Sequence, residues 1–358
     1  MLKYALAFGL LVLSGCQAGS PWGLVSTVAG ERRGIADGEG RAARFDNPTG
    51  LAVAADGTIY VADTHNHRIR AIDPARHVTT LAGGGPAGAP GGGDRDGPGA
   101  EARFRFPRDL ALDGAGHLYV ADTNNHRVRA IDLRDPAHHV TTIAGSVLGL
   151  RDGPGAAARF FDPWGLAAGP NGILYVSDTY NHRIRRIDTH ATGNPVSTLA
   201  GTGPTGSLGG GYLDGPGAKA YFKAPRGVVA DGDDVYVADA ANQAIRRISA
   251  GVVSTMGGTR TIVSSLAETV PLIYPTGLVM AHGAAGNHTL YAVDSGVATV
   301  YRVTGDGVRT WLVGGATMGN ADGFWRGGQF RQPAGIACDP AGNLLVTDTG
   351  NHRIRLVM

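Results

Sequence analysis

Two arginines and a tryptophan stand at one recurring place in the chain, directly after a proline that precedes an apolar stretch. Arg108 and Arg226 follow two of these prolines and Trp164 follows a third, while Asp109 takes a place that is glycine in the other five copies. Guanidinium groups bind anions through charged hydrogen bonds, and an aromatic face attracts cations. We therefore predict that Arg108, Asp109, Trp164 and Arg226 border a site for an anionic or carbohydrate-like ligand. The alternative is a solvated rim that binds nothing.

Histidines recur in an Asn-His-Arg motif, at His67, His126, His182 and His352. Metal binding would require their imidazoles to converge on one ion, at bond lengths of about 2.1 Å. Each belongs to a different copy of the repeat, and packed sheets lie about 10 Å apart. We therefore predict that these histidines build a repeated turn and bind no metal.

A second recurring motif is an Asp-Gly loop with a phenylalanine eight residues after the aspartate. It occurs at Asp37/Phe45, Asp96/Phe104, Asp152/Phe160, Asp214/Phe222 and, in a weaker form, Asp322/Phe330. Such a loop offers Ca²⁺ only one or two carboxylates. The prediction is a turn with glycine at positive φ and the phenylalanine packed between repeats, with a Ca²⁺ loop as the alternative.

Two Gly-x-Gly-x-x-Gly strings, at residues 83–88 and 201–206, resemble phosphate-binding loops in spacing only. A dinucleotide site needs the N-terminus of a helix directly after the glycines. Proline and further glycines occur there instead, so we predict no cofactor.

The elements that position these residues follow from an internal repeat of about 57 residues, seen from Asp63 to Asp348. Its clearest copies are residues 63–73, 122–132 and 178–188, and weaker copies begin at Asp239 and Asp294. Long internal periods of this kind mark repeat architectures such as propellers and solenoids.

Each repeat contains four short segments rich in β-branched residues, which in the first repeat are 50–53, 59–62, 68–72 and 78–82. Six such units predict an all-β fold, a six-bladed β-propeller of four-stranded antiparallel blades. The chain ends after the third strand of the sixth unit, and residues 25–30 supply a fourth. We expect this N-terminal strand to close the ring, which removes the exposed edges of an open solenoid.

The N-terminus predicts export. Lys3 precedes a short apolar run that ends in Leu-Ser-Gly-Cys, which resembles a bacterial lipobox. The run is too short for a stable membrane span and suits a signal peptide. We expect residues 1–15 to be a lipoprotein signal peptide, Cys16 to carry lipid, residues 16–24 to be a tether and residues 25–358 to be the propeller. The alternative is an ordinary secretory signal.

The Asn-His-Arg motif, the upstream proline and the Leu-Tyr-Val-Ala-Asp string resemble the NHL-repeat propellers, and the Asp-Gly loop is most similar to their bacterial and teneurin-like branch. The resemblance covers residues 25–358, although the fourth and fifth units lack Asn-His-Arg. That family includes protein-binding scaffolds, RNA binders and sensors. Related six-bladed propellers include lactone hydrolases and an amidating lyase, so the fold alone leaves the activity open.

Three functional classes remain. The first is a membrane-anchored, extracytoplasmic scaffold, expected to be a monomer, that binds a protein, glycan or anionic small molecule. If the four strands of each unit are lettered a to d in chain order, its binding face is that of the d–a and b–c loops. The second is a gluconolactonase-like hydrolase or lyase acting at the channel mouth, although no histidine flanks the six prolines. The third is a structural envelope protein. Export and a net charge of +2 argue against nucleic acid. We expect periplasmic localisation, at the outer membrane in a Gram-negative cell, with membrane contact through the lipid on Cys16 only.

Overall fold

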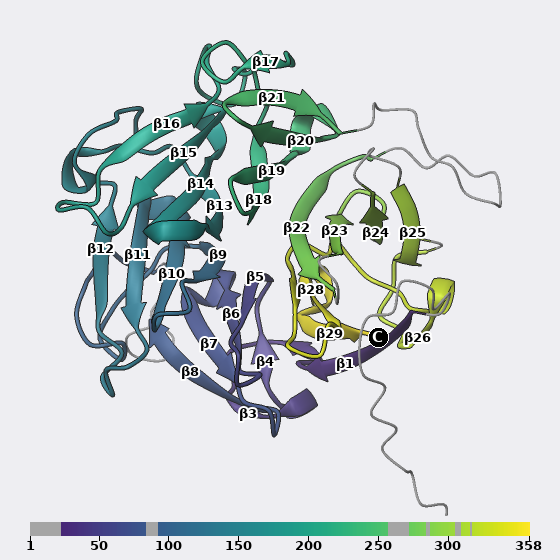
Figure 1. Cartoon of the computed structure of the whole chain (residues 1–358). Coiled ribbons are helices and arrows are strands. Elements are labelled where there is room, and N and C mark those ends of the chain that lie inside the picture. Colours follow the sequence, from purple (N-terminus) through teal and green to yellow (C-terminus); the bar gives the residue numbers. More distant parts are fainter. Residues whose placement is uncertain (1–22, 84–91, 257–271, 284–286, 305–308, 316) are drawn as a thin grey trace, which may run out of the picture.

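Six blades surround a central channel in the computed structural model, which describes residues 23–83, 92–256, 272–283, 287–304, 309–315 and 317–358 (Figure 1). The predicted signal peptide, Cys16 and most of the tether lie outside the described residues, as does most of the string at 83–88. No helix in the described ranges is long and apolar enough to cross a membrane. The all-β six-bladed propeller predicted from the repeat is confirmed.

Blades 1 to 3 each run from the channel outward in chain order. Blade 1 contains β5 (Pro48–Val53), β6 (Ile59–Asp63), β7 (Arg68–Ile72) and β8 (His77–Gly83), with β3 (Gly38–Glu39) at its outer edge. Blade 2 contains β9 (Pro107–Leu112), β10 (His117–Asp122), β11 (Arg127–Asp132) and β12 (Val140–Ala144). Blade 3 contains β13 (Pro163–Ala168), β14 (Ile173–Asp178), β15 (Arg183–Asp188) and β16 (Val196–Ala200).

Blades 4 to 6 follow the same plan. Blade 4 contains β18 (Pro225–Asp231), β19 (Asp234–Asp239), β20 (Ala244–Ser249) and β21 (Val252–Thr255), with β17 (Gly215–Pro216) outside. Blade 5 contains β22 (Pro275–His282), β23 (His288–Asp294), β24 (Thr299–Val303) and β25 (Arg309–Gly314). Blade 6 contains β27 (Ile336–Cys338), β28 (Leu344–Asp348), β29 (Arg353–Val357), β1 (Leu24–Ala29) and β26 (Gly323–Phe324).

The short elements are turns between these strands. A 3-10 turn joins the second and third strands of five blades: η2 (Thr64–Asn66), η3 (Thr123–Asn125), η6 (Thr179–Asn181), η7 (Ala240–Asn242) and η10 (Thr349–Asn351). Others are η1 (Gly40–Ala42), η4 (Gly155–Ala157), η5 (Pro170–Gly172) and η9 (Trp325–Gly327). Strands β2 (Arg32–Arg33) and β4 (Arg44–Phe45) form a small parallel pair.

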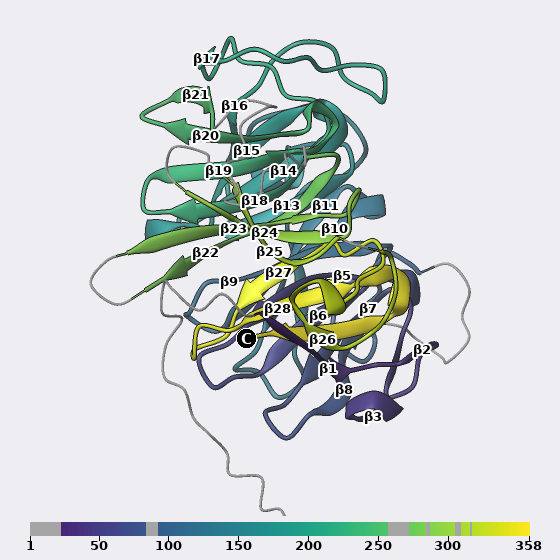
Figure 2. The ribbon, with the colours of Figure 1, turned by 90° about the vertical axis from the view of Figure 1, so that its right-hand side faces the viewer.

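The N-terminal strand closes the ring. β1 pairs antiparallel with β29, with Val25 opposite Val357, so the first and last described strands share blade 6. Figures 1 and 2 place β1 beside the C-terminal strands of this blade. The blades differ from the prediction in one respect. In blades 1, 4 and 6 the Asp-Gly loop adds a short fifth strand, because its backbone pairs with the outer strand of the sheet.

The phenylalanines of the Asp-Gly loops pack between blades, as predicted. Phe45, for example, is fully buried between Ile354 of blade 6 and Val61 of blade 1. The aspartates of these loops bind arginine, which the sequence analysis did not predict. In blade 3, Arg185 is fully buried and donates hydrogen bonds from Nη1 to Asp178 and from Nη2 to Asp152, each at 2.5 Å.

Equivalent pairs recur in blades 1, 2, 4 and 6. The arginines are Arg70, Arg129, Arg246 and Arg355, and the aspartates of the second strands are Asp63, Asp122, Asp239 and Asp348. Blade 5 keeps Asp294 but has Tyr301 on the facing strand. There the backbone amides of Ile273, Tyr274 and Gly296 donate to the carboxylate.

The Asn-His-Arg histidines join neighbouring blades. His67 adopts a left-handed conformation with φ of 58°, and its Nδ1 accepts a hydrogen bond of 3.1 Å from the backbone amide of Phe106 in blade 2. The same bond links His126 to Asp162, His182 to Ala224 and His352 to Asn47. These histidines therefore have the structural role that the repeat predicts.

Candidate functional site

Residues at or just before the start of the six inner strands meet around the channel. The residues that follow the prolines are Thr49, Arg108, Trp164, Arg226, Thr276 and Ala334. The next position must be glycine in most blades, because neighbouring strands approach closely there. A Cβ on Gly165 would lie 2.1 Å from the carbonyl oxygen of Arg226, and one on Gly335 would lie 2.3 Å from that of Thr49.

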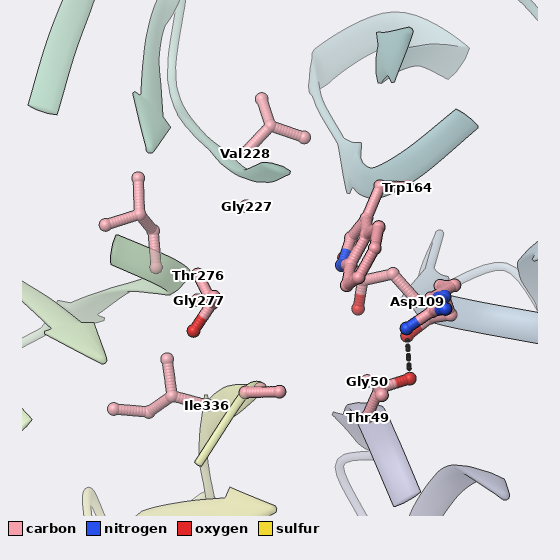
Figure 3. A pocket seen from close by; sticks show the side chains of 13 residues that line it. Thr49, Gly50, Asp109, Trp164, Gly227, Val228, Thr276, Gly277 and Ile336 are labelled. Carbon is pink, nitrogen blue, oxygen red and sulfur yellow. Dashed lines mark hydrogen bonds between the residues drawn. The ribbon is translucent and has the colours of Figure 1, made fainter. Parts of the chain in front are cut away.

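A small cavity lies inside this ring and has a free volume of about 30 Å³. Figure 3 shows Asp109, Trp164 and Thr49 on one side of it and Val228, Thr276 and Ile336 on the other. Because one water occupies about 30 Å³ in the liquid, this space suits water alone. A larger ligand would not fit inside this cavity.

Arg108, Trp164 and Arg226 form one stack across three blades. The guanidinium carbon of Arg108 lies 4.0 Å from the centre of the Trp164 ring, and that of Arg226 lies 3.8 Å from it. Two guanidinium groups can both approach so closely only from opposite faces of the indole. The structure thus brings these three residues together and places the indole between the two cations.

The stack extends to a fourth blade through Tyr274. The Arg226 guanidinium carbon lies 4.5 Å from the centre of the Tyr274 ring. Tyr274 directly precedes the proline of blade 5, at a place that differs in every repeat. The aromatic residue at this variable position was the signal that could have added Tyr274 to the predicted site.

Within the described part of the chain, the two arginines carry positive charge without an ion-pair partner in contact. Among the described residues neither guanidinium group has a hydrogen-bond acceptor, and the Nε atom of each is buried and unpaired. Burial, and secondly the charge of Arg226, lower the pKa of Arg108 to about 10, against the opposing effect of Asp162. Burial also lowers the pKa of Arg226. Both groups are charged at neutral pH, because the arginine side chain is not deprotonated in proteins, and they repel each other.

Asp109 does not neutralise them. Its Oδ1 accepts a hydrogen bond from its neighbour Leu110, and its Oδ2 accepts one of 3.0 Å from the backbone amide of Leu166 in blade 3. Burial raises the pKa of this carboxyl to about 7, although both amides lower it. Asp109 therefore borders the cavity as a link between two inner strands rather than as a partner of the arginines.

The raised pKa of Asp109 makes stability depend on pH. The folded chain holds this proton up to about pH 7, whereas an unfolded aspartate loses it near pH 3.9, so stability falls as pH rises between these values. We expect the difference in the free energy of unfolding between Asp109→Asn and the wild type to shift by about 2 kcal/mol in favour of the variant from pH 4.5 to pH 7.5. This shift is smaller than the pKa difference alone predicts, because the site borders water. Urea unfolding at several pH values measures this, and a constant difference would contradict it.

A family model of the NHL repeat matches residues 45–72, 104–131, 160–187 and 330–355. These segments lie in blades 1, 2, 3 and 6, which carry the Asn-His-Arg motif. Protein SUPPRESSOR OF QUENCHING 1, chloroplastic, from Arabidopsis thaliana is 27% identical over 342 residues, which cover 93% of this chain and 27% of that protein. NHL repeat-containing protein 2 from Gallus gallus is 30% identical over 70% of this chain and 38% of its own length.

Teneurin-4 from Mus musculus is 30% identical over 59% of this chain and 8% of that protein. This chain therefore matches well under half the length of these curated relatives. Among solved structures, an auxiliary nutrient binding protein from Bacteroides ovatus has a TM-score of 0.67 at 16% identity, covering 94% of this chain and 76% of its own. Virginiamycin B lyase from Staphylococcus aureus has a TM-score of 0.54 at 15% identity, with coverages of 94% and 99%. These structures share the fold.

Proposed function

We propose that this six-bladed β-propeller with NHL repeats is a binding protein that holds an anionic group at the mouth of its channel, at the edge of Trp164 and beside Arg108 and Arg226. The observation that carries the proposal is the pair of guanidinium groups stacked on Trp164 without an acceptor among the described residues. The ligand is a carboxylate, sulfate or phosphate, either free or attached to a protein or an acidic glycan.

Electrostatics favours an anion at this place. Two unit charges about 8 Å apart repel by about 2 kcal/mol at an effective dielectric constant of 20. An anion that accepts hydrogen bonds from both guanidinium groups replaces this repulsion with two attractions. Such charge-assisted bonds are about twice as strong as neutral ones.

The stack also restricts how the ligand is recognised. Both faces of the Trp164 indole are covered by guanidinium groups, so a sugar ring cannot lie on it. A glycan would therefore bind through an acidic substituent at the edge of the indole. The auxiliary nutrient binding protein from Bacteroides ovatus, which shares the fold, supports small molecules as the first class to test.

Loss of either arginine should weaken binding. We expect Arg108→Ala and Arg226→Ala each to lower the affinity for citrate and sulfate by about 10- to 100-fold, because a charged hydrogen bond contributes about 1.5–3 kcal/mol. Arg76→Ala, in a turn on the opposite face, is the control. Calorimetric titration at low ionic strength measures the affinities, and equal values for the three variants would remove the site.

We also propose that the protein is anchored in a cell envelope through lipid on Cys16, because Leu-Ser-Gly-Cys ends a run of signal-peptide length. Cys16→Ser should then move the protein from the membrane fraction to the soluble fraction, or leave its signal peptide uncleaved. Fractionation and mass spectrometry distinguish these results from the wild type. A variant of normal mass in the membrane fraction would exclude this anchor.

A further inference from the structure

Two histidines and an aspartate meet on the face opposite the channel mouth. His282 ends β22, His288 begins β23, and Asp231 ends β18 in the neighbouring blade. One ligand atom from each of the three residues lies within 4.8 Å of the other two. His288 Nδ1 is 2.7 Å from Asp231 Oδ2, and the two imidazole centres are 4.6 Å apart.

The strand register explains why the histidines face the same side. His282 and His288 are direct cross-strand partners in the hairpin of blade 5, and such partners project from the same face of a sheet. Asp231 ends the inner strand of blade 4, and this strand packs against β22. The triad therefore spans the boundary between blades 4 and 5.

We propose that Asp231, His282 and His288 bind one divalent transition-metal ion, with Zn²⁺ as the preferred ion, and that the ion ties blade 4 to blade 5. Two imidazole nitrogens and one carboxylate oxygen are a recognised ligand set for Zn²⁺, with bonds of about 2.0–2.2 Å and water at the fourth position. Imidazole ligands disfavour Ca²⁺ and Mg²⁺, which prefer oxygen. Both histidines are exposed, so their side chains can move the short distance that bonding requires.

As far as the described residues show, the boundary between blades 4 and 5 lacks two links found elsewhere in the ring. In four other blades a threonine hydroxyl of the 3-10 turn donates to the proline carbonyl of the next blade, as Thr179 does to Pro225. The histidine of the same turn accepts a second bond from that blade. In blade 4 these two positions are Ala240, which has no hydroxyl, and Gln243. The Tyr274 amide of blade 5 donates to Asp294 of its own blade instead. A metal ion on the opposite face would supply a link where these two are missing.

Zinc titration of the full chain, expressed without a histidine tag, tests the proposal. We expect one Zn²⁺ per chain by calorimetry at pH 7.5, and an affinity at least tenfold lower in His282→Ala and His288→Ala. His117→Ala is the matched control, because His117 Nδ1 also lies 2.7 Å from an aspartate, Asp113, while Arg134 contacts its other nitrogen. Equal zinc affinity in the wild type and the His288→Ala variant would overturn the site.

Thermal unfolding tests the bridging role separately. Excess Zn²⁺ should raise the Tm of the wild type by about 3–6 °C and leave that of His288→Ala unchanged, since an ion that binds only the folded state stabilises it. Mg²⁺ at the same concentration should have no effect. Asp231→Asn keeps the size of the side chain and should lose most of the zinc-induced shift. A shift of equal size in all variants would contradict a link between the blades.

Discussion

We expect Arg185→Met to lower the free energy of unfolding by about 3–5 kcal/mol, because it leaves the carboxylate of Asp178 buried without its cation. Arg185 and Asp178 are both fully buried, and Nη1 of the arginine donates to Oδ2 at 2.5 Å. Methionine fills much of the same space but can neither donate to Asp178 nor hold the loop aspartate Asp152. Urea unfolding monitored by circular dichroism measures the change.

Arg186→Met is the control, on the same strand. Arg186 is partly exposed, and its contact with Asp188 is 3.7 Å long. Exposed pairs of this kind contribute about 0–1 kcal/mol. If the two variants lost equal stability, the buried pairs would not hold the blades together. Adding Asp178→Asn to Arg185→Met should recover part of the loss, because it removes the unpaired charge.

Deleting residues 1–30 should destabilise the ring by several kcal/mol or prevent folding. The deletion removes β1, which pairs with β29 and buries Val25, Val28 and Ala29. Burying one large apolar side chain contributes about 1.5–3 kcal/mol, and a whole domain is stable by only about 5–15 kcal/mol. The deletion also leaves β29 with an unpaired edge.

A chain lacking only residues 2–22 is the control, because it keeps β1. Its Tm should equal that of the wild type within about 2 °C, whereas the longer deletion should lower Tm by at least 10 °C or yield aggregated protein. A longer deletion that melts with the control would show that β1 does not close the ring. Circular dichroism and size-exclusion chromatography make both comparisons.

The repeat made most of the fold predictable. Its period gave the number of blades, and the missing fourth strand of the last unit identified residues 25–30 as the closing strand. Positions that keep one residue type across repeats have structural roles, as the histidines and the loop phenylalanines do. Positions that vary between repeats pointed to Arg108, Trp164 and Arg226, since the repeats differ here where elsewhere they agree.

What the repeat could not predict depends on contacts between blades. The order of the stack, with Trp164 between the cations, depends on side-chain conformations that spacing does not specify. Asp109 was predicted to border the ligand site, yet its carboxylate binds backbone amides, which have no sequence signature. The Asp231, His282 and His288 cluster arises only when two blades pack side by side, and each residue alone is an ordinary polar residue at a strand end.

A crystal structure of the protein grown with selenate tests the central claim most directly, because the anomalous scattering of selenium locates the anion. We predict a selenate ion at the channel mouth, within hydrogen-bond distance of both Arg108 and Arg226 at the edge of Trp164. The Arg226→Ala variant, crystallised in the same way, should lack this peak. Selenate found only elsewhere on the wild-type surface, with water alone at the edge of Trp164 beside the two guanidinium groups, would contradict an anion-binding function for this site.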